Sequence, residues 1–544
     1  HPQSFSFGPF GEETGLGLDH VIADLAKAKH DDRIKGILLD MSGISAAPST
    51  IFDIHEALVD FKESGKWIVN YSEGISQGGY YLASVADEIY LYPQGDLDFR
   101  GLSAEMMYFK GLLDKLGVEV QVLRGPNNKY KSAVEPFMNS EMSASDREQT
   151  EALIGGIWNI MLEGISAQRD ISVDDLNRMC NNLEVRVAQD AVDLGLVDGL
   201  KYSDEIETLI QEKLGISDDA ETEDKDGKKK SKIAYVDLED YHHAKVEGSK
   251  SDSKWDSDRI AVVFAVGAIE SGEGDDTTIG SERIAEALRD ARLDDKVKAV
   301  VLRVNSPGGS ALASDVIWRE TELIKAAGKP FVVSMGDLAA SGGYYIACSA
   351  DRILANRNTI TGSIGVFGML PNLEGFYNEK LGVTFSRVNT NEHADIYSTN
   401  KGLDTLQLTA INESVAQIYT QFTGIVAAGR GMTVEEVEAV AGGRVWTGED
   451  ALSRGLVDEI GNLDSAIVRA AGLAGLDNYK IKSLPEMIDP FQEMMKELTG
   501  ETAVKALQKD LGIEADVLHN MMELDRILKS GDIQARLPYF LEIR

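Results

Sequence analysis

The 544-residue sequence is short of cysteine, of positive charge and of long apolar runs, and each shortage excludes a class of protein. Its two cysteines, Cys180 and Cys348, are too few for a disulfide framework or a cysteine-ligated metal site. Lysine and arginine number 54 against 90 acidic residues, and the resulting charge of −36 repels phosphate backbones, which disfavours nucleic-acid binding. The longest apolar run, residues 260–269, falls short of the roughly 20 residues of a spanning helix and is typical of a buried strand. We therefore expect the chain as it stands to be soluble.

What the chain does contain is one sequence block that occurs twice. Residues 76–81 (SQGGYY) recur as residues 340–345 (ASGGYY). Further matches follow in the same order: residues 31–35 with 294–298, 116–118 with 381–383, and 195–198 with 455–458. Ordered matches at so long a spacing predict a tandem duplication of a whole domain rather than a solenoid of short repeats.

The apolar content of 43% is sufficient for two buried cores in a chain of this length. In each repeat, helical patterns alternate with short β-branched strands, which predicts an α/β fold with parallel strands and right-handed crossovers. We assign residues 1–216 to an N-terminal repeat, 217–257 to a charged bridging linker, 258–474 to a C-terminal repeat and 475–544 to a helical C-terminal extension. Methionines at helical spacing in this extension are typical of core filling or oligomer contact.

The two copies of the block differ at the position where a nucleophile would stand, because Ser341 in the second copy corresponds to Gln77 in the first. Ser341 lies between an expected strand and an expected helix, where a serine can act simply as an N-cap. The two glycines that follow it, Gly342 and Gly343, permit another backbone to approach closely. The helix N-terminus also favours negative charge on a nearby oxygen. Ser341 is therefore our candidate nucleophile, with the N-cap as the ordinary alternative.

A glycine turn upstream suggests where an oxyanion would bind. Residues 305–310 (NSPGGS) follow an expected strand, so the turn lies at the carboxyl edge of a parallel sheet, where open α/β folds bind ligands. We expect Gly308 or Gly309, together with Gly342, to donate to the oxyanion, each donor contributing about 2.7–4 kcal/mol to transition-state stabilisation. The first repeat has residues 41–44 (MSGI) here and lacks the turn.

A serine nucleophile needs a base, and histidine does not readily supply one. Among the eight histidines, only His393 lies near the relevant blocks, in an expected loop at residues 389–395. A lysine can act as the base when burial lowers its pKa. Lys129 and Lys131 stand in the first repeat, where ordinary surface exposure is the alternative for both. Complementarity favours Lys131, because the repeat without the serine carries this lysine and the matching region of the second repeat has none.

Four motifs together are similar to a known family. Residues 130–137 (YKSAVEPF), 305–310, 340–345 and 361–366 (TGSIGV) resemble the long, two-repeat bacterial form of the signal peptide peptidase A family, over nearly the whole chain. The resemblance implies a tandem pair of Clp protease/crotonase-like domains with a Ser/Lys dyad split between the repeats. It implies the following roles: Ser341 as nucleophile, Lys131 as general base, Ser363 as the residue that orients the lysine amine, and Gly308, Gly309 and Gly342 around the oxyanion.

The resemblance further implies a serine endopeptidase that degrades cleaved signal peptides, or other apolar membrane-associated peptides, through an acyl-enzyme and without a metal or cofactor. It implies a homo-oligomer, commonly a tetramer, on the periplasmic side of the bacterial inner membrane. The chain begins His1-Pro2-Gln3, which is typical of a processed or truncated form, so we expect the N-terminal anchor to lie outside it. Three alternatives stay open: His393 as the base, a crotonase-type acyl-CoA enzyme, and a catalytically silent oligomeric scaffold.

Overall fold

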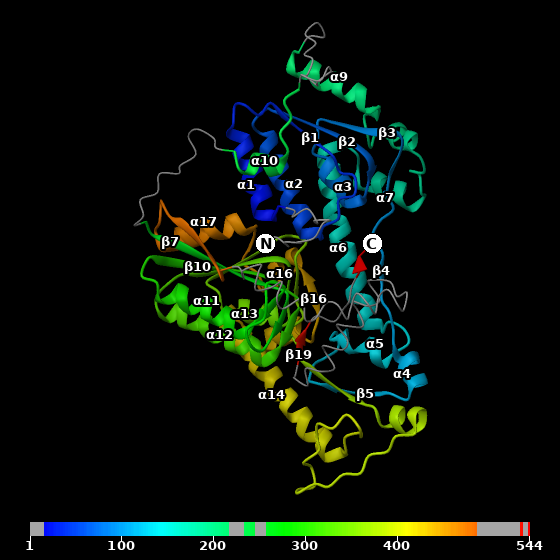
Figure 1. Ribbon diagram of the computed structural model, residues 1–544, viewed down its shortest axis with the longest axis vertical. Coiled ribbons are helices and arrows are strands. Elements are labelled where there is room, and N and C mark those ends of the chain that lie inside the picture. Colours follow the sequence, from blue (N-terminus) through cyan, green and yellow to red (C-terminus); the bar gives the residue numbers. More distant parts are fainter. Residues whose placement is uncertain (1–15, 217–232, 245–256, 487–533, 537–541, 544) are drawn as a thin grey trace, which may run out of the picture. The chain divides into compact units, whose positions relative to one another are not determined.

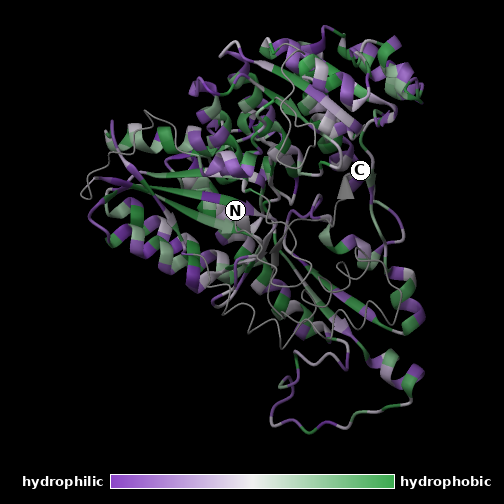
Figure 2. Cartoon of the chain, turned by 45° about the horizontal axis from the view of Figure 1, so that its top comes forward, coloured by the Kyte–Doolittle hydropathy of each residue, from purple (hydrophilic) through white to green (hydrophobic). Residues whose placement is uncertain are grey.

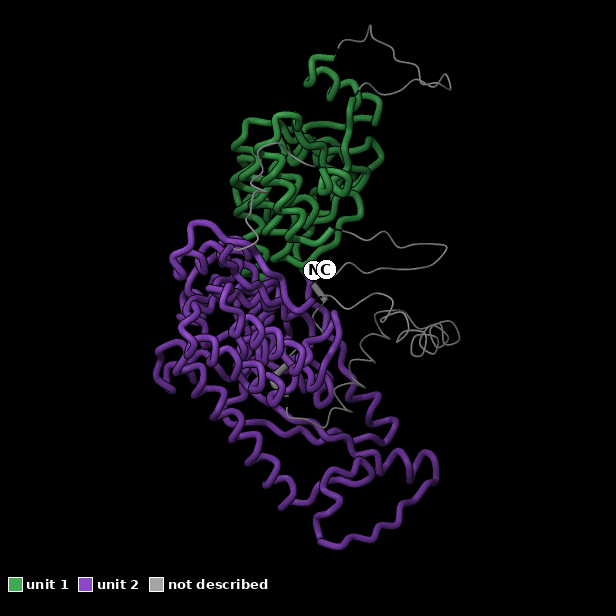
Figure 3. Tube along the Cα trace, turned by 60° about the vertical axis from the view of Figure 1, so that its left-hand side comes forward, with its two compact units in different colours: residues 1–102, 155–253 green, residues 103–154, 254–544 purple. Residues whose placement is uncertain are grey.

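The computed structural model describes five stretches of the chain (Figure 1): residues 16–216, 233–244, 257–486, 534–536 and 542–543. They fall into two compact units, the first from residues 1–102 and 155–253 and the second from residues 103–154 and 254–544 (Figure 3). The units do not coincide with the expected repeats, because residues 103–154 of the first repeat pack into the second unit. Lys131 and Ser341 therefore belong to the same unit.

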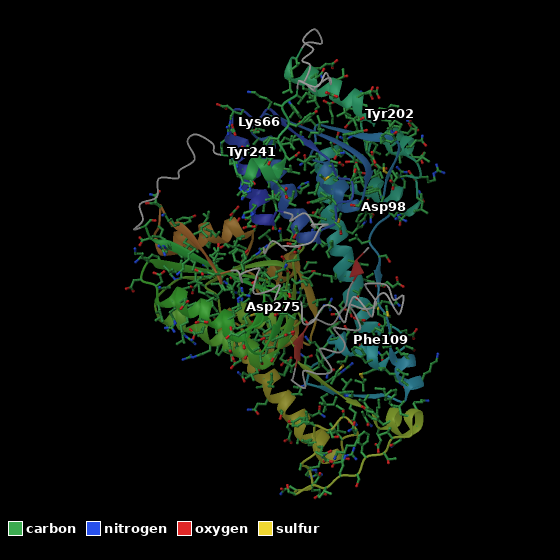
Figure 4. All side chains as sticks on the ribbon, in the orientation of Figure 1. Lys66, Asp98, Phe109, Tyr202, Tyr241 and Asp275 are labelled. Carbon is green, nitrogen blue, oxygen red and sulfur yellow. The ribbon has the colours of Figure 1, made fainter. Side chains whose placement is uncertain are left out.

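Unit 1 is built on a parallel sheet, as the alternating pattern predicts. The strand order is β1 (Gly36–Leu39), β2 (Trp67–Ile75), β3 (Glu88–Leu97) and β6 (Gly199–Leu200). Its helices are α1 (Leu18–His30), α2 (Pro48–Lys62), α3 (Gln77–Ala83), the later part of α6 (Ala144–Arg169), α7 (Val173–Asn181), α8 (Ala188–Asp193) and α9 (Ser203–Leu214). Of the expected linker, residues 233–244 and residue 257 are described. The first of these segments contains α10 (Leu238–His242), where Tyr241, labelled in Figure 4, donates a hydrogen bond to Asp31 at 3.1 Å.

Unit 2 contains a larger sheet of eight strands, parallel except between β14 and β16. Its strands are β7 (Arg259–Val266), β10 (Val297–Ser306), β12 (Phe331–Ala340), β13 (Arg352–Ala355), β14 (Ile360–Gly362), β16 (Val445–Thr447), β17 (Glu459–Ile460) and β18 (Lys480–Leu484). Its helices are α11 (Ser281–Leu293), α12 (Ala311–Ala326), α13 (Gly342–Ala347), α14 (Thr405–Arg430), α15 (Val434–Val440), α16 (Gly448–Ser453) and α17 (Leu463–Ala474). In Figure 2 the strands of this sheet are mostly hydrophobic. Their central positions are buried on both faces, which explains their nearly continuous apolar sequences.

Unit 2 also contains a second sheet, of six strands. Its order is β5 (Glu119–Arg124), β15 (Phe367–Asn372), β19 (Gln534–Arg536), β11 (Gly308–Ser310), β8 (Ala268–Glu270) and β9 (Thr278–Gly280). Beside it lie α4 (Lys110–Leu116), the short 3-10 turn Ser132–Val134, α5 (Glu135–Met138) and the π-helical turn Phe376–Leu381. Phe109, labelled in Figure 4, stacks on Phe137 with ring centroids 5.8 Å apart. These rings belong to an apolar cluster with Val134, Phe367 and Met369, which packs the lysine-bearing segment onto β15.

The expected helical extension differs from the structure where it is described. Within residues 475–544, the described residues form strand β18, strand β19 and strand β20 (Glu542–Ile543), which pairs with β4 (Ala104–Glu105). These segments are strands because they pair with β7, β11 and β4. The spacing of hydrophobic residues in the sequence does not show which strands a segment will pair with. The methionine-rich part, residues 487–533, lies outside the described residues. No helix among the described stretches is long and apolar enough to cross a membrane.

The duplication is visible in matching hydrogen bonds within the two units. Tyr80 donates to the Leu196 carbonyl at 2.7 Å, and Tyr344 donates to the Leu456 carbonyl at 2.8 Å. Two lysines also correspond: Lys66, labelled in Figure 4, donates to the carbonyls of Ala28 and Asp31, and Lys329 donates to those of Ala291 and Asp294. Equivalent positions thus make equivalent contacts, as the duplication predicts.

Candidate active site

Ser341 stands at the junction of β12 and α13 in a strained conformation. Its φ of 54° and ψ of −113° lie where a residue with a Cβ is seldom found, and such strain is typical of functional turns. The backbone is held because Ser341 N donates to the Gly362 carbonyl at 2.8 Å, while the Ser341 carbonyl accepts from Tyr345 N at 2.8 Å. The hydroxyl does not cap α13, so the N-cap alternative is wrong for this residue.

The first repeat shows what an ordinary serine does at this turn. Ser76 caps α3 by accepting a hydrogen bond from Gly79 N at 3.2 Å. Gln77, which stands in place of Ser341, accepts from the main-chain N–H groups of Arg100 and Gly101 at 2.8 and 2.6 Å and donates to the Gly101 carbonyl at 2.9 Å. This copy of the turn is therefore closed by an amide that holds the neighbouring loop.

Lys131 meets Ser341 inside unit 2. Its Nζ lies 2.9 Å from Ser341 Oγ, 3.0 Å from Ser363 Oγ and 3.1 Å from the Ser363 carbonyl oxygen. All three residues are buried, with Lys131 only 1% exposed. The structure thus brings together Ser341, Lys131 and Ser363, although the sequence places the lysine more than 200 positions from either serine.

Burial favours the neutral form of this lysine. Desolvation holds the pKa of Lys131 well below its ordinary value, and its hydrogen-bond partners are hydroxyl and carbonyl oxygens rather than carboxylates. A neutral amine has two N–H donors and one lone pair. The donors can serve the two oxygens of Ser363, which leaves the lone pair for the Ser341 hydroxyl proton. That is the arrangement a general base requires.

Of the glycines expected around an oxyanion, Gly342 directly follows Ser341, and the turn with Gly308 and Gly309 lies against α13, the helix that Gly342 opens. Gly308 N–H donates to Ser306 Oγ at 3.1 Å, and Gly309 pairs with β8 on one side and β19 on the other. Gly342 opens α13, where the first N–H groups of a helix have no helical acceptor. A Cβ at Gly343 would lie 2.9 Å from the Ser306 carbonyl oxygen, so this glycine lets α13 pack against the turn.

The rival candidates have other partners. Lys129 is exposed and its Nζ lies 2.8 Å from Tyr130 Oη. His393 Nδ1 lies 3.3 Å from Gln407 Nε2, whereas Ser341 Oγ contacts Lys131 and, at 3.4 Å, the Gly365 carbonyl among the described residues. The two cysteines are buried free thiols, and desolvation raises the pKa of each to about 12, which makes them poor nucleophiles.

Sequence reasoning missed part of the site. Gln149 on α6 and the loop Gly442-Gly443-Arg444 before β16 surround the main chain of Lys131, and neither was a candidate. The adjacent glycines Gly442 and Gly443 were the available signal, since both adopt positive φ angles.

The chain matches a peptidase family and several proteins named as proteases. The model of peptidase family S49 matches residues 60–217 and 324–477, one segment in each expected repeat. Protease 4 of Salmonella typhi is 39% identical over 496 residues (89% of this chain, 76% of that protein), and Protease 4 of Haemophilus influenzae is 36% identical over 545 residues (96% and 84%). The chloroplastic serine protease SPPA of Arabidopsis thaliana is 33% identical over 500 residues (90% and 70%).

Among solved structures, a mutant form of ClpP1 from Listeria monocytogenes aligns over 38% of this chain and 94% of its own, with 16% identity and a TM-score of 0.25, which is too low to carry an argument. The resemblance to the signal peptide peptidase A family is confirmed by the family match and by these relatives. On these matches, the chain belongs to peptidase family S49.

Proposed function

We propose that this S49 peptidase is a serine endopeptidase in which Ser341 is the nucleophile and Lys131 the general base. The observation that carries the proposal is the 2.9 Å approach of the desolvated Lys131 amine to Ser341 Oγ. Ser363 orients that amine through its hydroxyl and carbonyl oxygens. General-base catalysis of this kind contributes on the order of 10²- to 10⁴-fold to the rate.

The reaction proceeds in two halves. Ser341 Oγ attacks the carbonyl carbon of the scissile peptide while its proton moves to Lys131 Nζ. The lysine ammonium then gives this proton to the leaving amine, the C–N bond breaks, and an ester of Ser341 remains. In the second half, Lys131 takes a proton from water, the hydroxyl attacks the ester, and the proton returns to Ser341 as the carboxylic acid leaves. Atoms and charge balance with water as the only co-reactant.

The oxyanion formed in each half would be stabilised by main-chain N–H groups of Gly308, Gly309 and Gly342. In the free site Gly308 N–H donates to the neutral hydroxyl of Ser306 at 3.1 Å. An N–H bond to an oxyanion is shorter and roughly twice as strong as a bond between neutral groups, so the negative charge would compete well for this donor. Ser306 Oγ would therefore accept the Gly308 N–H bond in the free site and lose it when the oxyanion forms.

We infer that the substrate binds as an extended strand between β11 and β15. Support comes from β19, a segment of the chain itself, which pairs antiparallel with both strands at this place. Main-chain pairing with a sheet edge binds peptides of many sequences. Phe367 and the apolar cluster next to β15 suit apolar residues, which fits the proposed substrates: cleaved signal peptides or other apolar peptides near a membrane.

By resemblance we also propose a membrane-tethered homo-oligomer, commonly a tetramer, with its sites on the periplasmic side of a bacterial inner membrane. A match to a peptidase family gives no support to the acyl-CoA alternative. The silent scaffold would require that the assembled chain turn over no peptide or ester.

Steady-state hydrolysis of an apolar peptide ester tests the proposal, with light scattering to confirm equal assembly of each variant. We expect Ser341→Ala to abolish turnover and Lys131→Ala to reduce kcat by at least about 10²-fold. Lys129→Ala, two positions away and exposed, is the matched control and should retain activity. Full activity of Lys131→Ala contradicts the dyad, and an inactive unmodified assembly supports the scaffold.

A further inference from the structure

The main chain of Lys131 is held by groups that belong neither to the nucleophile nor to the oxyanion turn. We propose that Gln149, together with residues 442–445, positions the general base, and we call this set the lysine bracket. The proposal rests on the Ser341–Lys131 dyad proposed above. Gln149 touches no reacting atom, so its role would be exerted through Lys131.

The lysine occupies the centre of a tight turn. Its φ of −79° and ψ of 75° are those of an inverse γ-turn, and Ser132 N donates to the Tyr130 carbonyl at 2.9 Å across it. A turn of three residues has little internal support beyond this one bond. The direction in which the side chain of Lys131 leaves the backbone therefore depends on what surrounds the turn.

Gln149 closes one side of the turn. Its Nε2 donates to the Tyr130 carbonyl at 3.0 Å and lies 3.0 Å from Ser132 Oγ, so one amide spans the residues on both sides of Lys131. Gln149 is 1% exposed and lies on α6, a regular helix. A buried amide with several partners is costly to disturb and holds its neighbours in one geometry.

Gly443 closes the other side. It has a φ of 82°, and a Cβ at this position would lie 2.5 Å from Lys131 Cβ and 2.6 Å from its Cα. No other residue type could let the loop approach the lysine backbone so closely. Tyr130 N donates to the Gly442 carbonyl at 2.9 Å, which anchors the turn to the same loop.

The loop also holds the residue that orients the amine. Ser363 N donates to the Arg444 carbonyl at 2.7 Å, and Gly443 N donates to the Ile364 carbonyl at 2.9 Å. Val445 N donates to Gln149 Oε1 at 3.4 Å, which links the two sides of the bracket. The lysine turn and the Ser363 turn thus share one support, so a shift of the bracket would change the distance from Lys131 to both serines.

The expected effect is catalytic because the general base works only in a narrow geometry. A misplacement of about 1 Å can cost on the order of 10²-fold in rate. We therefore expect Gln149→Leu to lower kcat about 10- to 100-fold for a peptide ester and to leave KM within about twofold, since no bracket residue lies in the slot between β11 and β15. Gly443→Ala should act in the same direction.

The control is Gln407→Leu. Gln407 is 2% exposed and lies on α14, and its side chain bonds to Asp404 N at 3.1 Å and lies 3.3 Å from His393 Nδ1, partners outside the dyad and the bracket. It should cost comparable stability while kcat stays unchanged. Gln149→Asn is the second variant, for use if Gln149→Leu fails to assemble. It keeps the amide but places it one methylene short of its partners, so we expect it to fold and to have a lowered kcat.

Combining Gln149→Leu with Lys131→Ala separates positioning from a structural role. If Gln149 acts through the lysine, Gln149→Leu should lower the rate at which a fluorophosphonate labels Ser341 when Lys131 is present. In the Lys131→Ala background it should cause no further loss in this rate. Equal fractional losses in both backgrounds, or unchanged kcat in Gln149→Leu and Gln149→Asn, would overturn the bracket. Full activity of Lys131→Ala alone would instead overturn the dyad, so the two failures are distinguishable.

Discussion

Replacing Lys131 by methionine should stabilise the protein while it destroys activity. Methionine fills a similar volume without a charge to desolvate, whereas Lys131 is buried and bonds to no carboxylate in the part of the chain that the structure describes. The structure therefore places a functional group where it costs stability, as active sites commonly do. The cost has a pH dependence whose sign follows from the lowered pKa.

In the folded protein Lys131 loses its proton at a pH well below 10.5, the ordinary pKa at which the unfolded chain loses it. Between these two values unfolding takes up one proton, so the free energy of unfolding rises with pH by up to about 1.4 kcal/mol per pH unit. Below the folded pKa both states are protonated and this slope vanishes. Lys131→Met lacks the slope, so its advantage over the unmodified protein should shrink as the pH rises towards 10.5.

Differential scanning calorimetry of both proteins from about pH 6 to about pH 10 measures this. We expect a higher Tm for Lys131→Met at neutral pH and a gap that narrows at alkaline pH. Lys129→Met is the control, because Lys129 is exposed and its pKa is raised by its hydrogen bond to Tyr130. A Tm gap that stays constant over the whole range would refute the reasoning, because it would mean that Lys131 is charged in the folded state.

Three further predictions follow from the site. Ser363→Ala removes one of the two oxygens that orient the amine, and its kcat should fall about 10-fold with unchanged KM, measured with a peptide ester; an unchanged kcat would argue against this role. Gln77→Ser should create no second labelled serine by mass spectrometry, because the Gln77 side chain bonds to main-chain groups of residues 100–101 and, among the described residues, to no lysine amine. Its Tm should fall as these bonds are lost. Ala535→Pro removes a strand N–H from β19 and should lower KM for added peptide severalfold if β19 competes for the slot; an unchanged KM would mean that substrate binds elsewhere.

Local signals were sufficient to predict much of the fold. The expected alternation of helices and short β-branched strands is present in both repeats, for example in helix α11 and the strand β10 that follows it. Both elements have strong periodic patterns and polar residues at their ends, so the tertiary structure only reinforces what the local sequence favours. The duplication was equally clear, because matched motifs such as residues 195–198 and 455–458 keep the same hydrogen-bonding tasks.

Which residues belong to which unit could not be predicted from such local signals. Residues 103–154 leave the first unit and pack with the second, where β5 pairs with β15 and the segment from Phe109 to Phe137 joins an apolar cluster. Such pairing depends on contacts over more than 200 positions and leaves no local trace. The strands of the C-terminal extension escaped prediction for the same reason.

For the site, complementarity between the repeats pointed to Lys131 and Ser341, but it could not provide the environment of the lysine. The low pKa depends on burial, and burial depends on Gln149 and Gly443, which approach from α6 and from the loop before β16. Gln149 looks like an ordinary polar residue of a helix until the fold brings its amide to the lysine turn. Sequence motifs indicate which residues react, whereas the residues that position them are found only from the tertiary contacts.

The most direct test of the central claim is the rate at which a fluorophosphonate labels Ser341, followed by mass spectrometry between about pH 5 and about pH 10 in the unmodified chain and in Lys131→Ala. We expect labelling at Ser341 alone, with a rate that rises as the lysine loses its proton and then levels off, and a rate about 10²-fold or more lower in Lys131→Ala. Equal rates and equal pH profiles in the two proteins would contradict a lysine base for Ser341.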